Sequence, residues 1–249
     1  MKQATKKILI TIAQIAALVT VALLLWYIAA RAVNVDLIVP EPLAVIKLTV
    51  SLLGQGATYL ALLSTLLRAV IAFAVSLVVA SLCCMLIVVW RHSALCVNAV
   101  ATFLRALPTI AVILVTMILF PSTVVPVVVA FLVVFPVIFS KLKRELEHSG
   151  NLLAVCDVYG VSAAKRVKYV FFPILRDEAM SIVGDELPLC IKVVIAGEVL
   201  AYPRSGIGSD MYVGKVNFDT AQIVALTLLT LIVCFTISGV VAVIKRKKI

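Results

Sequence analysis

Charged residues are scarce in this chain of 249 residues: they make up 14% of the sequence, whereas hydrophobic residues make up 64%. A soluble domain of this size has about 25% charged and about 45–50% apolar residues. So short a chain has too little interior volume to hide this apolar excess in a core. The composition therefore excludes an ordinary soluble domain.

The residue patterns that hold nucleotides or metals are also missing. His92 and His148 are the only histidines, and the six cysteines contain no Cys-x-x-Cys pair, so no metal cluster or catalytic triad is expected. The stretch nearest to a phosphate-binding loop, residues 208–215, has one residue too many between its glycines and is followed by Val216 instead of Ser or Thr. We therefore expect no catalytic residue, no metal, no cofactor and no enzymatic activity in the chain itself.

Long apolar runs are what the sequence has in abundance. Runs near or above 18 residues predict membrane-crossing helices, because a helix satisfies its own backbone hydrogen bonds in lipid. The predicted fold class is all-α, a polytopic membrane helix bundle with about six transmembrane helices. The first run exceeds the 7–15 residues of a signal peptide, so it is interpreted as an uncleaved anchor. The expected spans are residues 8–30, 69–90, 106–120 (longer if 93–104 belongs to it), 124–139, 179–201 and 221–244.

The distribution of Lys and Arg predicts the orientation in the membrane. Alternating the connections places both termini and residues 140–177 on the strongly basic side, which the positive-inside rule assigns to the cytoplasm. We expect residues 1–249 to form a single multi-pass domain in the cytoplasmic (inner) membrane of a prokaryote, in contact with the lipid bilayer. The basic residues are scattered over helix ends and form no stripe, so the net charge of +10 does not indicate nucleic-acid binding.

Two connections have helical signals of their own. On the expected outer side, Pro42 begins and Gly54 follows an apolar stretch, which is typical of a short interfacial helix. In residues 140–177, an apolar stretch stops at Gly160, Ser162 follows as a helix cap, and Pro173 stops a second stretch. Such a pair of helices has an apolar face to bury, either against a cytoplasmic partner or against its own bundle, and the residues leave both open.

Residues 140–177 resemble the Glu-Ala-Ala loop of the permease subunits of binding-protein-dependent ABC importers. Gly160 and Pro173 fall at the spacing of that motif, and Ser162 matches a frequent companion. Further segments resemble the nitrate, taurine and alkanesulfonate branch of the family in the same order along the chain. These segments are residues 37–42, 104–108, 190–200 and 205–208, and the resemblance extends from about residue 35 to residue 240.

The resemblance implies a type I importer fold and a set of partners. These are a second copy of the chain, two copies of an ATPase subunit that hydrolyses the ATP, and a periplasmic or lipid-anchored substrate-binding protein. The substrate would be a small anion or small organic solute, such as nitrate, taurine or another sulfonate, or a thiamine-precursor pyrimidine. Coupling to the ATPase would use Ala154, Val155, Cys156, Asp157, Tyr159, Gly160, Ser162 and Pro173.

One position departs from the family pattern. Ala154 stands where the motif has its Glu, and Val155 and Cys156 replace its two alanines. The helix-Gly-helix arrangement remains, so docking is still expected. Asp157, one turn further on, is expected to supply the missing carboxylate.

Ionisable residues inside the predicted spans cost about 2.5–3.5 kcal/mol each at a bilayer centre, so they tend to face protein or water. Arg68 is expected to reach the outer interface from the end of its span. Asp185 and Lys192 share a helix stripe. Lys192 is expected either to form a structural pair, with Asp185 or with a carboxylate of another helix, or to line a pathway. Pro188 leaves the Gly184 carbonyl without its helical partner. The pathway candidates are Arg105, Pro108, Asp185, Lys192 and Glu198.

A self-contained secondary transporter is the alternative function. Lys192 and the carboxylates of the fifth predicted span would then form an ion relay. Secondary transporters are often built from internal repeats, and no convincing repeat relates the two halves of this chain. The importer subunit is therefore favoured.

The orientation predicts which positions react from outside the cell. In a cysteine-free background, single cysteines at positions 165 and 248 should resist a membrane-impermeant thiol reagent in intact cells, because both lie on the predicted cytoplasmic side. A cysteine at position 215 should react. Labelling of position 165 from outside would contradict the predicted topology.

Overall fold

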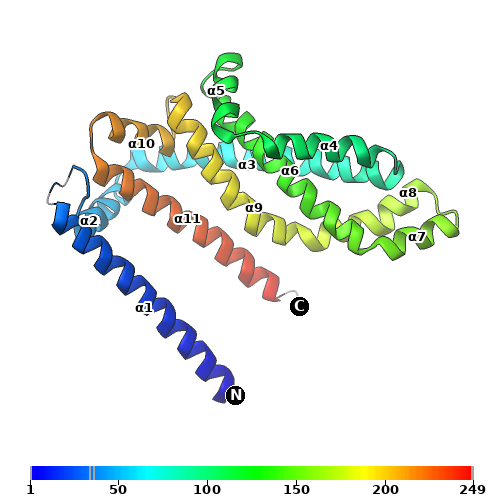
Figure 1. Ribbon diagram of the computed structural model, residues 1–249, viewed down its shortest axis with the longest axis horizontal. Helices are drawn as coiled ribbons and strands as arrows, with labels where there is room; N and C mark the ends of the chain where they lie inside the picture. Colours follow the sequence, from blue (N-terminus) through cyan, green and yellow to red (C-terminus); the bar gives the residue numbers. More distant parts are fainter. Residues whose placement is uncertain (1, 34, 36, 248–249) are drawn as a thin grey trace. The chain divides into compact units, whose positions relative to one another are not determined.

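The computed structural model describes residues 2–33, 35 and 37–247 (Figure 1), and Lys248 of the basic tail lies outside this range. The described residues form helices joined by short turns and contain no strand, which confirms the all-α class. In chain order the helices are α1 (Lys2–Val33), α2 (Pro42–Leu53), α3 (Gly56–Val89), α4 (Ser93–Ala106), α5 (Thr109–Leu119), α6 (Val125–His148), α7 (Gly150–Val158), α8 (Ala163–Arg166), η1 (Val167–Phe171), α9 (Phe172–Ala201), α10 (Ile207–Val216) and α11 (Thr220–Lys247).

Several helices are long and apolar enough to cross a membrane. Within the described residues these are α1, α3, α6 and α11, and α4 with α5 would make a fifth span if the two are counted together. Helix α9 has the length, but its acidic and basic residues exclude it from this group. The apolar helices indicate a multi-pass membrane protein, and the number of six spans stays a prediction.

Predicted span boundaries differ from the observed helix ends, most of all in the second and fourth spans. The second span was expected to begin at Ala69, but α3 begins at Gly56 and passes through Arg68 without interruption. The charge of Arg68 suggested a boundary, but in the fold this charge is paired with Glu198. Helix α6 also continues beyond the predicted end at Phe139. Its last turns contain good helix formers and an i,i+4 ion pair between Lys143 and Glu147.

The third predicted span is sharply bent. Leu107 and Pro108 have extended backbone angles (ψ 128° and 125°), and α4 and α5 meet there at 97°. Proline disfavours the helical conformation of the residue before it and has no N–H to donate. The apolar stretch is therefore two helices with a corner at Pro108.

Pro173 does not end a helix, contrary to the prediction. Helix α8 passes through the π-helix η1 into α9 without a break, and the Phe172 N–H donates to the Val167 carbonyl in the i→i+5 pattern of a π turn. Pro173 lies in the first turn of α9. The helical path therefore continues through Pro173, directly after the π turn.

The helices form two compact units. One joins the described part of residues 1–56 with residues 213–229, and the other joins residues 57–212 with the described part of residues 230–249. In the first unit, the Trp26 indole N–H donates to the Pro40 carbonyl at 3.1 Å, and Arg31 lies 3.5 Å from Glu41. These contacts hold the segment before α2 against the end of α1. Helix α2 itself confirms the short helix predicted after Pro42.

The second unit is organised around α9. Helices α6 and α9 share the most extensive contact (Figure 1), and a Cβ atom added at Gly197 would lie 2.9 Å from the Cα atom of Pro126 in α6. The Gly184 carbonyl, which Pro188 leaves without a helical partner, accepts a hydrogen bond from the Ser238 hydroxyl of α11 at 3.1 Å. Thus α9 packs closely against α6 and has its freed carbonyl satisfied by α11.

The close contact at Gly197 predicts the effect of a larger residue. Gly197→Val should lower the melting temperature of the purified protein, because two backbones would have to separate, at a cost of about 1–3 kcal/mol. Gly239→Val is the matched control, since nothing lies within 4 Å of a Cβ atom there. Equal melting temperatures of the two variants in the same detergent would contradict the close α6–α9 contact.

Candidate functional site

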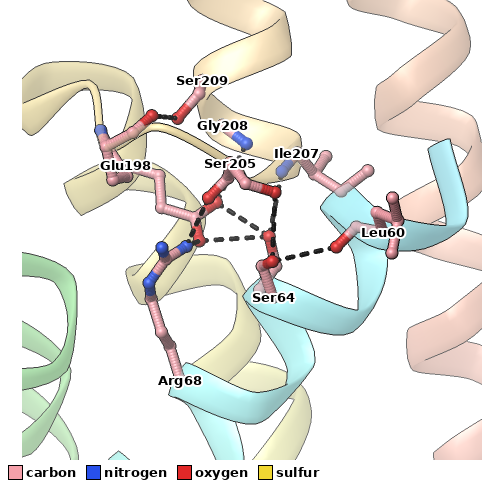
Figure 2. A network of polar contacts seen from close by, with 10 residues as sticks. Leu60, Ser64, Arg68, Glu198, Ser205, Ile207, Gly208 and Ser209 are labelled. Carbon is pink, nitrogen blue, oxygen red and sulfur yellow. Dashed lines mark hydrogen bonds and ion pairs between the residues drawn. The ribbon is translucent and has the colours of Figure 1, made fainter. Parts of the chain in front are cut away.

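The carboxylate of Glu198 lies at the centre of a polar network in the second unit. Glu198 is 0% exposed and sits near the end of α9, where its carboxylate accepts hydrogen bonds from three groups. The donors are the Arg68 guanidinium at 2.6 Å, the Thr65 hydroxyl at 2.9 Å and the Gly208 N–H at 3.0 Å. Figure 2 shows that Arg68 approaches from α3 and Gly208 from the start of α10.

The same network fixes the segment between α9 and α10. Arg68 also donates to the Ser205 carbonyl at 2.7 Å, and the Ile207 N–H donates to the Thr65 hydroxyl at 2.9 Å. A second contact joins the hydroxyls of Ser64 and Ser205 at 3.0 Å. A buried carboxylate is tolerated only when it is paired and hydrogen-bonded, so the α9–α10 segment and α3 hold one another in place.

Two glycines let the chain approach Glu198 closely. A Cβ atom at Gly206 would lie 2.6 Å from the Glu198 carboxylate, and one at Gly208 would lie 2.4 Å from the Ile195 carbonyl oxygen. Tyr202 ends α9 with a left-handed backbone (φ 46°), which is uncommon for a residue other than glycine. The Gly-x-Gly spacing of residues 206–208 therefore follows from contact with α9.

Arg68 and Lys192 are not placed as the sequence suggested. Arg68 does not reach for the outer interface but pairs with Glu198 inside the unit. Asp185 pairs with Lys141 of α6, and Glu186 lies 3.7 Å from the same ammonium. The alternative that Lys192 pairs with Asp185 is wrong, because the carboxylate of Asp185 finds its cation on another helix. Lys192 is exposed and has no ion pair among the described residues.

The two remaining pathway candidates lie at the α4–α5 corner. Pro108 forms the corner itself, as the residue before α5. Arg105, in the last turn of α4, donates to the Pro136 carbonyl of α6 at 3.0 Å. The corner is therefore tied to the middle of α6.

Gly160 ends α7 as predicted. Its backbone is left-handed (φ 61°), the Val161 N–H donates to the Cys156 carbonyl at 2.9 Å, and the Gly160 N–H donates to the Asp157 carbonyl at 3.2 Å. These two bonds form a Schellman motif, which satisfies carbonyls at the helix end. Ser162 is the N-cap residue of α8, as predicted, but its hydroxyl makes no capping hydrogen bond.

Arg166 holds the turn between α7 and α8 closed. Its Nε donates to the Val161 carbonyl at 2.8 Å, and its Nη1 forms an ion pair with Asp157. Arg91, at the end of α3, lies 3.8 Å from the other oxygen of that carboxylate. Asp157 therefore has ion-pair partners in its own chain, and its replacement of the missing Glu of the motif stays a prediction. The spacing of Asp157 and Arg166 around Gly160 was the signal that the sequence reasoning missed.

One side of α7 presents exposed side chains. Val158 is 83% exposed and Tyr159 79% exposed, and Val155 is half exposed, whereas Cys156 is buried. Ala154 is exposed too. One side of the helix thus packs on its own bundle, while the other presents apolar surface.

The described residues contain no group of three or more His, Cys, Asp or Glu side chains able to hold a metal ion. No protein-family model matches the chain, and no curated protein matches it.

The Glu198 network predicts a strongly coupled pair of substitutions. Arg68→Met should destabilise the protein by about 3–5 kcal/mol, because it leaves a carboxylate buried without its cation. Arg68→Met combined with Glu198→Gln should recover most of this loss, since a neutral amide still accepts from Thr65 and Gly208. Unfolding curves of the two single variants and the double variant give the coupling energy. Free-energy changes that add within about 0.5 kcal/mol would contradict the pairing.

Proposed function

We propose that this chain is the membrane-spanning permease subunit of an ATP-driven ABC importer, working as a homodimer with two separate ATPase subunits. The single observation that carries the proposal is the α7–α8 turn, defined as residues 150–166. It combines a left-handed Gly160 with an exposed apolar face made by Val155, Val158 and Tyr159. These features agree with the motif that residues 140–177 resemble.

The turn is suited to docking because it is already ordered. The Schellman motif at Gly160 and the contacts of Arg166 fix its backbone without a partner. An ordered surface loses little conformational entropy on binding. Its exposed valines and tyrosine supply apolar area for a groove in the ATPase subunit.

Helix α9 supplies the connection from the turn to the translocation pathway. It continues from α8 and η1 without a break, and its exposed residues include Asp185 and Lys192. Charged residues on a helix among apolar neighbours tend to face water or protein rather than lipid. In the dimer this stripe would border the pathway, and movement of the ATPase subunits would reach it through the turn. The solute would be a small anion or small organic molecule delivered by an external binding protein.

Gly160→Val should weaken docking of the ATPase subunit without affecting insertion of the chain into the membrane. A β-branched residue in a left-handed backbone costs about 1–2 kcal/mol, enough to weaken docking about five- to thirty-fold. In cells that make the protein naturally, the tagged variant should reach the membrane at the normal level. The amount of ATP-hydrolysing subunit that co-purifies with it should fall.

Three control variants sharpen this experiment. Gly239→Val adds the same side chain in open space and should co-purify the ATPase normally. Gly160→Asn should retain most of the docking, because asparagine tolerates the left-handed region, and Ala154→Glu should be tolerated. The proposal fails if no ATP-hydrolysing subunit accompanies the wild-type chain, or if Gly160→Val binds that subunit as well as Gly239→Val does.

A further inference from the structure

A basic hollow lies along the seam between α4 and α6 in the second unit. Its volume is about 400 Å³. Three cationic side chains line it: Arg105 from α4, and Lys143 and Arg144 from α6. Asn98 and Thr102 add neutral side chains that can donate hydrogen bonds, while the Ser140 hydroxyl, also in the wall, already donates to the Pro136 carbonyl at 2.8 Å.

Donors exceed acceptors in this hollow. Glu147 is its one lining carboxylate, and it already lies 3.0 Å from the Lys143 ammonium. Arg105 donates one N–H to the Pro136 carbonyl, and the Arg144 Nε lies 3.9 Å from a carboxylate oxygen of Glu145. A guanidinium carries five N–H donors and an ammonium three, so most of the donors remain for a ligand. The wall therefore suits an anion with several acceptor oxygens.

The surroundings of the hollow are apolar. Phe139 and Ala101 contribute to its wall and are buried, while Val100 and Phe103 on α4 are more than half exposed. Here α6 also changes from its apolar part to the charged residues 141–148. A basic pocket between helices at such a boundary is suited to the headgroup of an anionic lipid.

We propose that this hollow binds a phosphate group, which Arg105, Lys143 and Arg144 hold by charge-assisted hydrogen bonds. Arginine matches phosphate with two parallel N–H donors, and lysine adds a point charge. The phosphate belongs either to an anionic phospholipid at the membrane surface or to a soluble phosphate-bearing anion. The site is independent of the proposed transport function.

Phosphate binding would also change the charge next to the α7–α8 turn. A second hollow of about 440 Å³ lies beside the first and shares Asn98, Lys143 and Glu147 with it. Its wall includes Ala154 and Asp157 of α7. A phosphate that draws Lys143 away from Glu147 therefore changes the charge facing the turn.

The test uses the full purified chain with any subunits that accompany it, after removal of native lipid. The melting temperature is followed during titration with anionic phosphatidylglycerol, with zwitterionic phosphatidylcholine, which has no net charge, as the comparison, and separately with inorganic phosphate. Stabilisation by phosphatidylglycerol beyond phosphatidylcholine assigns a lipid source. Stabilisation by inorganic phosphate alone assigns a soluble source. Either result supports a phosphate site.

Variants show whether the hollow is responsible. Arg144→Gln and Lys143→Gln should each weaken the apparent affinity about five-fold. Arg144→Gln is the cleaner of the two, because its side chain is largely exposed and it leaves the Lys143–Glu147 pair intact. Arg176→Gln removes the same charge from an exposed position that lines neither hollow, and it should keep the wild-type affinity. The proposal is overturned if neither probe stabilises the protein, or if Arg176→Gln loses as much affinity as Arg144→Gln.

Discussion

A carboxylate without solvent exposure, that of Glu198, constrains how α3, α9 and α10 of the second unit meet. A buried charge without partners would cost several kcal/mol, so Arg68, Thr65 and the Gly208 N–H must all reach it. This requirement explains why α3 continues through Arg68 and why residues 206 and 208 are glycines. The helix packing and the shape of the α9–α10 segment both follow from one buried ion pair.

The sequence predicted the features that depend on local chemistry. Apolar runs located most of the helices, because a backbone in lipid must form its hydrogen bonds within the chain. Gly160 marked a helix end, because few residues other than glycine adopt the left-handed conformation found there. The ion pairs were not predictable in the same way. Arg68 pairs with Glu198 and Lys141 with Asp185 across long stretches of chain, and such partners are chosen by helix packing that no local pattern records.

Three prolines show that the rule that proline interrupts a helix gives different results at different positions. Pro108 forms a corner, Pro173 falls in the first turn of a helix, and Pro188 lies inside a helix that continues. A proline inside a helix leaves one carbonyl without its helical partner, and another group can then satisfy it. For Pro188 this is the Ser238 hydroxyl, a group fifty residues later in the chain. A proline in an apolar stretch therefore marks a place where neighbouring helices decide the backbone.

Helices α8, η1 and α9 form one uninterrupted helical segment. Residues 163–201 form a helical rod of about 58 Å at 1.5 Å per residue, with the Gly160 turn before one end and the Glu198 network near the other. The π turn at Val167–Phe171 holds one residue more than an α turn. Every side chain beyond the π turn is therefore rotated by about 100° from the position it would have in an unbroken α-helix. The extra residue thus sets which side of α9 carries Asp185 and Lys192 relative to the α7–α8 turn.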